Sequence, residues 1–221
     1  MVCTSIIHQP YERCKEIIAT AEMAELRMDL LDLSDNQLIA LLSEANIPTI
    51  VTCHESSYSN KYTEQERIAL LKLAVDAGTA YIDVDLESES KLELVAYAHS
   101  KGCKVIVSYH NDKRTPSLQE LQYIEARCRS YNPDIVKLVG TANAEEDNAE
   151  ILSLYGFSTI RKEKDLVAFA MGEKGRISRL ACLYMGAPHT YASAEHGMEA
   201  AGGQLTADEM RRCIAILSRN V

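Results

Sequence analysis

Residues 104–139 have the sequence KVIVSYHNDKRTPSLQELQYIEARCRSYNPDIVKLV. The short apolar runs Lys104–Tyr109 and Ile135–Val139 predict two strands, and Leu118–Arg129 between them has the apolar spacing of a helix. Ser117 precedes that helix as a candidate N-cap. This order predicts two parallel strands joined by a helical crossover, each strand buried on both faces.

The same alternation continues along the whole chain. Predicted strands lie at Cys3–Ile7, Met23–Met28, Thr49–Cys53, Tyr81–Val84, Lys104–Tyr109, Ile135–Val139, Leu166–Met171 and Ala187–Tyr191. Ser34 and Thr206 are further candidate N-caps, and Gly78 and Gly102 follow helices where a left-handed residue is needed. Eight strand and helix units within 221 residues favour a (β/α)8 TIM barrel, with one catalytic domain over residues 1–221. A doubly wound sheet is the structural competitor, but the chain lacks the glycine-rich phosphate-binding motifs of nucleotide folds.

Composition limits the class of ligand. The formal net charge of −9 argues against a nucleic acid or an anionic membrane as the main partner. No run of about 18 apolar residues predicts a membrane span, and residues 1–7 make a poor signal peptide. The seven Cys form no C-x-x-C pair, and the spacing of His8, His99, His189 and His196 suits no metal. We therefore expect a cytoplasmic protein with reduced cysteines, no metal, and structural or surface roles for these four histidines.

Polar residues lie where the predicted strands end, which is where a barrel carries its active site. Lys137 is flanked by Ile135, Val136, Leu138 and Val139. Burial would lower the pKa of this lysine and make it a nucleophile toward ketones. The alternative is a lysine that extends from a strand end into solvent.

Other strand ends carry groups suited to proton transfer or to binding an anion. His110 ends the fifth strand and is a candidate proton shuttle, or else a turn histidine. Glu25 and Arg27 share one face of the second strand, so each must pair with the other or with a ligand. Asp83 and Asp85 have the same spacing, and a structural role as partners of lysines or arginines is the favoured interpretation there.

Several segments together resemble type I 3-dehydroquinate dehydratase. The matching stretches are Glu25–Asp29, Val107–His110, Asp134–Lys137, Met171–Leu180 and Gly203-Gln204, in the family's order. The resemblance implies a homodimeric barrel of the shikimate pathway, active in chorismate and aromatic amino acid biosynthesis, that needs no cofactor. It implies that Lys137 forms an imine with the small-molecule substrate 3-dehydroquinate, and that His110 moves the protons of the dehydration. Substrate contacts implied by the family pattern are Glu25, Arg27, Arg179, Gln204 and, near the pocket, Ser5.

This chain departs from the family pattern at four positions: His54, Tyr58, Asn111 and Ala200. His54 stands where the family usually has an arginine, so we expect His54 or Glu55 to replace part of the substrate clamp. The glycine-containing segment Ala194–Thr206 predicts a loop that closes over the substrate and brings Gln204 inward. A class I aldolase on the same barrel, or a barrel that binds a metabolite with impaired catalysis, are the alternatives.

Overall fold

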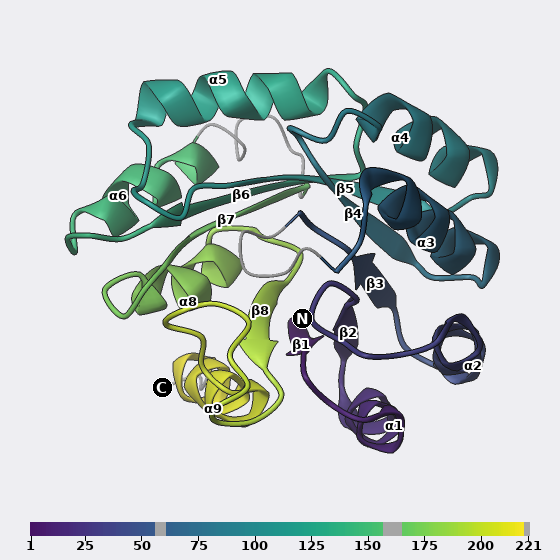
Figure 1. Cartoon of the computed structure of the whole chain (residues 1–221). Coiled ribbons are helices and arrows are strands. Elements are labelled where there is room, and N and C mark those ends of the chain that lie inside the picture. Colours follow the sequence, from purple (N-terminus) through teal and green to yellow (C-terminus); the bar gives the residue numbers. More distant parts are fainter. Residues whose placement is uncertain (56–60, 157–164, 219–221) are drawn as a thin grey trace.

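A computed structural model describes residues 1–55, 61–156 and 165–218 (Figure 1). Its eight parallel strands form one sheet in the order β7-β6-β5-β4-β3-β2-β1-β8. The strands are β1 (Val2–Ile6), β2 (Met23–Arg27), β3 (Thr49–Thr52), β4 (Tyr81–Asp85), β5 (Lys104–His110), β6 (Ile135–Thr141), β7 (Leu166–Met171) and β8 (Thr190–Ser193). The rings of Phe169 on β7 and Tyr191 on β8 lie 6.1 Å apart, so side chains join the two ends of the sheet. The predicted TIM barrel is confirmed.

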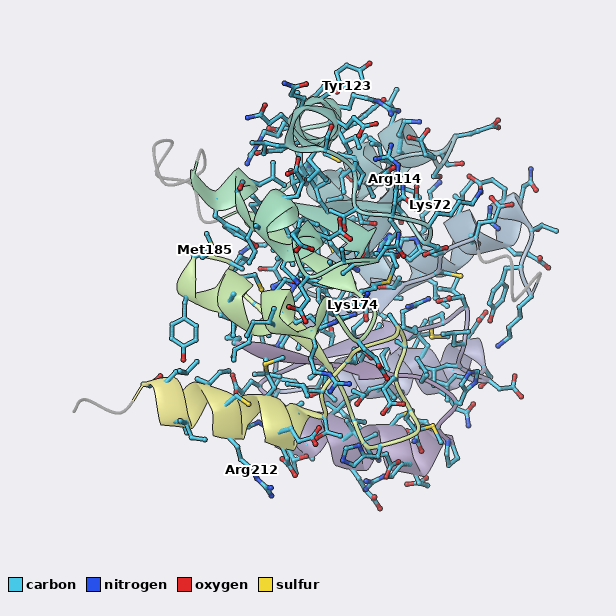
Figure 2. The ribbon with its side chains drawn as sticks, turned by 90° about the vertical axis from the view of Figure 1, so that its left-hand side faces the viewer. Lys72, Arg114, Tyr123, Lys174, Met185 and Arg212 are labelled. Atoms are coloured by element: carbon cyan, nitrogen blue, oxygen red, sulfur yellow. The ribbon has the colours of Figure 1, made fainter. Side chains whose placement is uncertain are left out.

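Helices cover the outside of the sheet (Figure 1). They are α1 (Tyr11–Thr20), α2 (Asp35–Glu44), α3 (Glu64–Asp76), α4 (Lys91–Ser100), α5 (Leu118–Arg129), α6 (Asp147–Leu152), α8 (Arg176–Tyr184) and α9 (Ala207–Leu217). In Figure 2 the side chains of Tyr123 on α5 and Arg212 on α9 point outward, away from the strands. No helix within the described residues is long and apolar enough to cross a membrane.

Local capping chemistry sets where several helices begin and end. The three predicted N-caps, Ser34, Ser117 and Thr206, each accept a hydrogen bond from a backbone N–H in the first turn and complete a capping box. Gly78 and Gly102 have φ angles of +89° and +78°, as expected for left-handed residues after a helix.

The predicted last strand, Ala187–Tyr191, begins too early. Gly186 has a φ of +112°, and the Ala187 N–H donates to the Cys182 carbonyl at 2.9 Å, so residues 186–187 form the turn that follows α8. Pairing with β1 starts at Thr190, whose N–H donates to the Met1 carbonyl at 3.1 Å. The strand therefore covers Thr190–Ser193.

The strand register places alternate side chains inside the barrel. Ser5 pairs with Glu25 on the neighbouring strand, and Ser108 pairs with Lys137. The interior of this barrel is therefore polar toward the carboxyl ends of its strands. Apolar packing lies mainly between the strands and the helices, where buried cysteines such as Cys14 and Cys128 act as small hydrophobic residues.

Candidate active site

A cavity of about 560 Å³ opens at the carboxyl ends of the strands. Eight residues singled out in the sequence all line it: Ser5, Glu25, Arg27, His54, His110, Lys137, Arg179 and Gln204. They come from strands β1, β2, β5 and β6, from the segment after β3, from α8 and from the segment before α9. The fold thus brings together side chains that are up to about 200 residues apart in sequence, as expected for a barrel site.

Lys137 lies on β6 with its side chain inside the barrel and is only 5% exposed. Its Nζ donates to Asp83 Oδ2 at 2.8 Å and lies 3.8 Å from Glu25 Oε1. The same atom lies 4.4 Å from the ring centroid of Tyr191. Burial alone would lower the lysine pKa, but the carboxylates of Asp83 and Glu25 outweigh burial and raise it. The sequence-based expectation of a lowered pKa is therefore wrong for the free protein.

Glu25 is held in place by hydroxyl groups on both neighbouring strands. Ser5 Oγ donates to Glu25 Oε2 at 2.7 Å, and Thr52 Oγ1 donates to Oε1 at 2.8 Å. All three side chains are buried. These two hydrogen bonds therefore hold the Glu25 carboxylate in a fixed position that faces Lys137.

Arg27 pairs with Asp29 and not with Glu25. The guanidinium donates to the two carboxylate oxygens of Asp29 at 3.0 and 2.6 Å, a bidentate geometry. The predicted pair between Glu25 and Arg27 does not form, because both groups have other protein partners. The alternative, that each binds a ligand, stays a prediction. Arg27 still lines the cavity, so a ligand can meet its outer face.

Two histidines from the strands on either side of β4 meet in the cavity. His110 ends β5 and His54 follows β3, and their ring centroids lie 5.1 Å apart in an edge-to-face arrangement. Burial lowers the pKa of His110 well below its usual range, and the positive charge of Lys137 lowers it further. His110 is therefore neutral near pH 7 and can accept a proton.

Arg179 is a buried cation without an ion-pair partner among the described residues. The residue is 1% exposed, its guanidinium carbon lies 4.5 Å from the ring centroid of Phe169, and Nη2 donates to the Gly202 carbonyl at 3.2 Å. Its Nε makes no hydrogen bond to any described residue. Burial lowers the arginine pKa to about 10. A charge held in this way suits an anionic ligand in the cavity.

The segment between β8 and α9 covers one side of the cavity. Gln204 is nearly buried there, and its Oε1 accepts the Ala200 N–H at 2.8 Å. The Gly172 N–H donates to the Gly202 carbonyl at 2.9 Å, which ties this segment to the end of β7. Gly203 has a φ of +75°, and a Cβ there would collide with the Gly172 carbonyl oxygen. The close approach requires glycine, while closure over a substrate stays a prediction.

Sequence reasoning undervalued two acidic residues. Asp83 is the partner of a lysine, as predicted. That lysine is Lys137, so the Asp83 carboxylate belongs to the site. Asp85 lies beside His54, with Asp85 Oδ2 3.6 Å from Nδ1. Their alternation at a strand end, the same signal as Glu25 and Arg27, could have identified them. Tyr191, which lies under Lys137, carried no such signal.

The other histidines and the departures from the family pattern have varied surroundings. His189 is 1% exposed rather than on the surface, and burial lowers its pKa to about 3. His8 lines the cavity with a φ of +50°. Asn111 accepts two backbone N–H groups in the turn after β5. Ala200 lines the cavity, and Tyr58 lies outside the described residues.

Comparison with known proteins gives the family. A 3-dehydroquinate dehydratase of Dehalococcoides mccartyi is 33% identical over 213 residues, which cover 95% of this chain and 92% of the relative. One from Pyrococcus abyssi is 34% identical and covers 98% of both chains. The crystal structure of the 3-dehydroquinate dehydratase from Aquifex aeolicus has a TM-score of 0.80 at 26% identity and covers 100% of both chains. The family model described as type I 3-dehydroquinase matches residues 2–221, and this chain therefore belongs to that family.

Proposed function

We propose that this hydro-lyase of the shikimate pathway holds 3-dehydroquinate as an imine on Lys137 and moves protons with His110. The family membership makes the chain a 3-dehydroquinate dehydratase. One observation carries the residue roles: the buried Nζ of Lys137 faces the cavity between the carboxylates of Asp83 and Glu25, and His110 lines the same cavity.

The charges around Lys137 act differently at successive steps. The amine must lose its proton before it attacks the C3 ketone, and the two carboxylates oppose that loss. Attack and loss of water then give an iminium cation at the position that the ammonium held. The same carboxylates and the face of the Tyr191 ring stabilise this cation. The contacts that disfavour the free amine therefore favour the intermediate.

The elimination needs a base and an acid in turn. His110, neutral near pH 7, takes the C2 proton, and the C–H electrons move toward the iminium nitrogen to give an enamine. The enamine electrons expel the C1 hydroxyl, which leaves as water with the proton from His110. Water then hydrolyses the new iminium, releases 3-dehydroshikimate and restores the amine of Lys137.

Cations at the cavity wall suit the substrate carboxylate. Arg179 has free hydrogen-bonding capacity at Nε and lacks an ion-pair partner in the described chain, so we assign the carboxylate mainly to it. Arg27, on β2, lines the same cavity and adds positive charge. Glu25, Gln204 and, more remotely, Ser5 are assigned to the ring hydroxyl groups.

Two variants test the assignment through the absorbance of the conjugated product. Lys137→Met should abolish measurable turnover, and His110→Gln should lower kcat by about 10²- to 10⁴-fold. Lys104→Met, at the amino end of β5, is the matched control and should keep the parent rate. Turnover by Lys137→Met at the parent rate would refute the imine mechanism.

The homodimeric state, the cytoplasmic location and the biosynthetic direction are further proposals that the family resemblance supports. Light scattering coupled to gel filtration tests the first, with a mass of about twice the 24.6 kDa chain expected. A mass equal to one chain would contradict it.

A further inference from the structure

His54 has a carboxylate facing each of its two ring nitrogens. Nε2 lies 3.5 Å from Asp83 Oδ1, and Nδ1 lies 3.6 Å from Asp85 Oδ2. Asp83 and Asp85 are two residues apart on β4, so both point into the barrel, and β4 neighbours β3, which His54 follows. Two carboxylates of one strand, β4, thus clamp the imidazole that follows the neighbouring strand β3.

Because the His54 ring is largely buried, its nitrogens depend on the carboxylates of Asp83 and Asp85 for polar contacts. The His54 side chain is 11% exposed, and that of Asp83 is fully buried. Neither Nε2 of His54 nor Oδ1 of Asp83 makes a hydrogen bond to a described residue, so the 3.5 Å ion-pair contact between them is the polar contact that these two atoms have. Buried polar atoms without partners are unfavourable, so these two atoms are best satisfied by each other.

The clamped ring is in turn the contact that orients His110. The two rings meet edge to face, with an interplanar angle of 70°. Within the described part of the chain, no hydrogen bond fixes the imidazole of His110, although its backbone belongs to β5. The ring of His54 is therefore a contact that can limit rotation of that imidazole.

We propose that His54 is a positioning residue, clamped by Asp83 and Asp85, that holds His110 at the angle needed for proton transfer. Asp83 then serves both reacting groups, because its other oxygen accepts the hydrogen bond from Lys137. This role differs from the substrate contact expected from the sequence, and it rests on the proposed function of His110 as the group that moves the proton.

The test separates positioning from binding. We expect His54→Ala to lower kcat by about 10- to 100-fold with KM within about twofold of the parent, since a base displaced by about 1 Å loses that much rate. With substrate deuterated at C2, the isotope effect on kcat should increase, because proton removal becomes slower than the other steps. His99→Ala is the matched control, since His99 also pairs with an aspartate, Asp134, but lies on α4 away from the cavity.

A second pair of variants tests the clamp at a partly exposed position. Asp85→Ala removes the carboxylate that faces Nδ1 and should also lower kcat, whereas Asp85→Asn keeps a side-chain oxygen at that position and should restore most of the rate. These variants keep the proposal testable if His54→Ala fails to fold, which circular dichroism reports.

Two results would overturn the proposal. A raised KM with kcat and isotope effect unchanged would make His54 a substrate ligand. Unchanged kinetics in folded His54→Ala would leave it without a role. Borohydride reduction of the parent protein with substrate separates this outcome from a failure of the proposed function. If Lys137 carries the adduct and the His54 variants have unchanged kinetics, only the positioning role is refuted.

Discussion

Replacement of Arg179 by methionine should weaken substrate binding and stabilise the fold at the same time. Burial lowers the pKa of this arginine to about 10, a shift that corresponds to about 3 kcal/mol against the charged form. The contact with the Phe169 ring and the hydrogen bond to the Gly202 carbonyl each offset about 1 kcal/mol of this. Arg179→Met should therefore raise the free energy of unfolding by about 1 kcal/mol.

The kinetic effect has the opposite sign. A charge-assisted hydrogen bond to a carboxylate contributes about 1.5–3 kcal/mol, so KM for 3-dehydroquinate should rise about 10- to 150-fold. Urea unfolding measures the stability, and product absorbance measures KM.

Arg27→Met is the matched contrast in the same cavity. This change removes the bidentate partner of the buried Asp29, so the free energy of unfolding should fall by about 3 kcal/mol. Our account of the cavity charges is refuted if Arg179→Met unfolds at lower urea than the parent and retains its KM.

Three further outcomes follow from the buried ring groups. The ring carbon shifts of His110 should stay constant in NMR spectra from pH 8 to pH 6, since its pKa is lowered well below 6.5; a midpoint near 6.5 would contradict this. The unfolded chain protonates His189 below about pH 6.5 but the folded protein only near pH 3, so His189 contributes a loss of about 2 kcal/mol of stability between pH 7 and pH 5. In urea unfolding, His189→Gln should lose about 2 kcal/mol less than the parent over this range. Tyr191→Phe keeps the ring face under Lys137 and should hold kcat/KM within about threefold, whereas Tyr191→Leu should lower it about 5- to 30-fold; equal product formation by both variants would exclude the ring contact.

The barrel was predictable because buried parallel strands leave uninterrupted apolar runs that can be seen without any tertiary information. The strand ends β1 to β7 accordingly lie close to the predicted bounds. The last strand was misplaced because the C-terminal turn of α8 at Gly186 precedes an apolar residue, Ala187, that resembles a strand start. The starts of helices α1 and α8 leave no capping signal in the sequence, because Pro10 and Gly175 make no side-chain hydrogen bond there.

The sequence was enough to predict which residues line the cavity, but not how their charges pair and shift the pKa of Lys137. The rule that a barrel site lies at the carboxyl ends of its strands was enough to bring Lys137, His110 and Arg179 to one cavity. The raised pKa of Lys137 depends on Asp83, which comes from another strand 54 residues away in sequence. A local sequence pattern does not show which side chains from different strands lie close together in the barrel. Burial alone therefore suggested the wrong direction for the pKa shift of Lys137.

The most direct measurement is mass mapping after borohydride reduction in the presence of 3-dehydroquinate. If the amine of Lys137 joins the ketone, the peptide that contains Lys137 gains the mass of the reduced substrate adduct, and Lys104 and other lysines remain unmodified. Active turnover with an unmodified Lys137 peptide, or an adduct on a different lysine, would contradict our central claim.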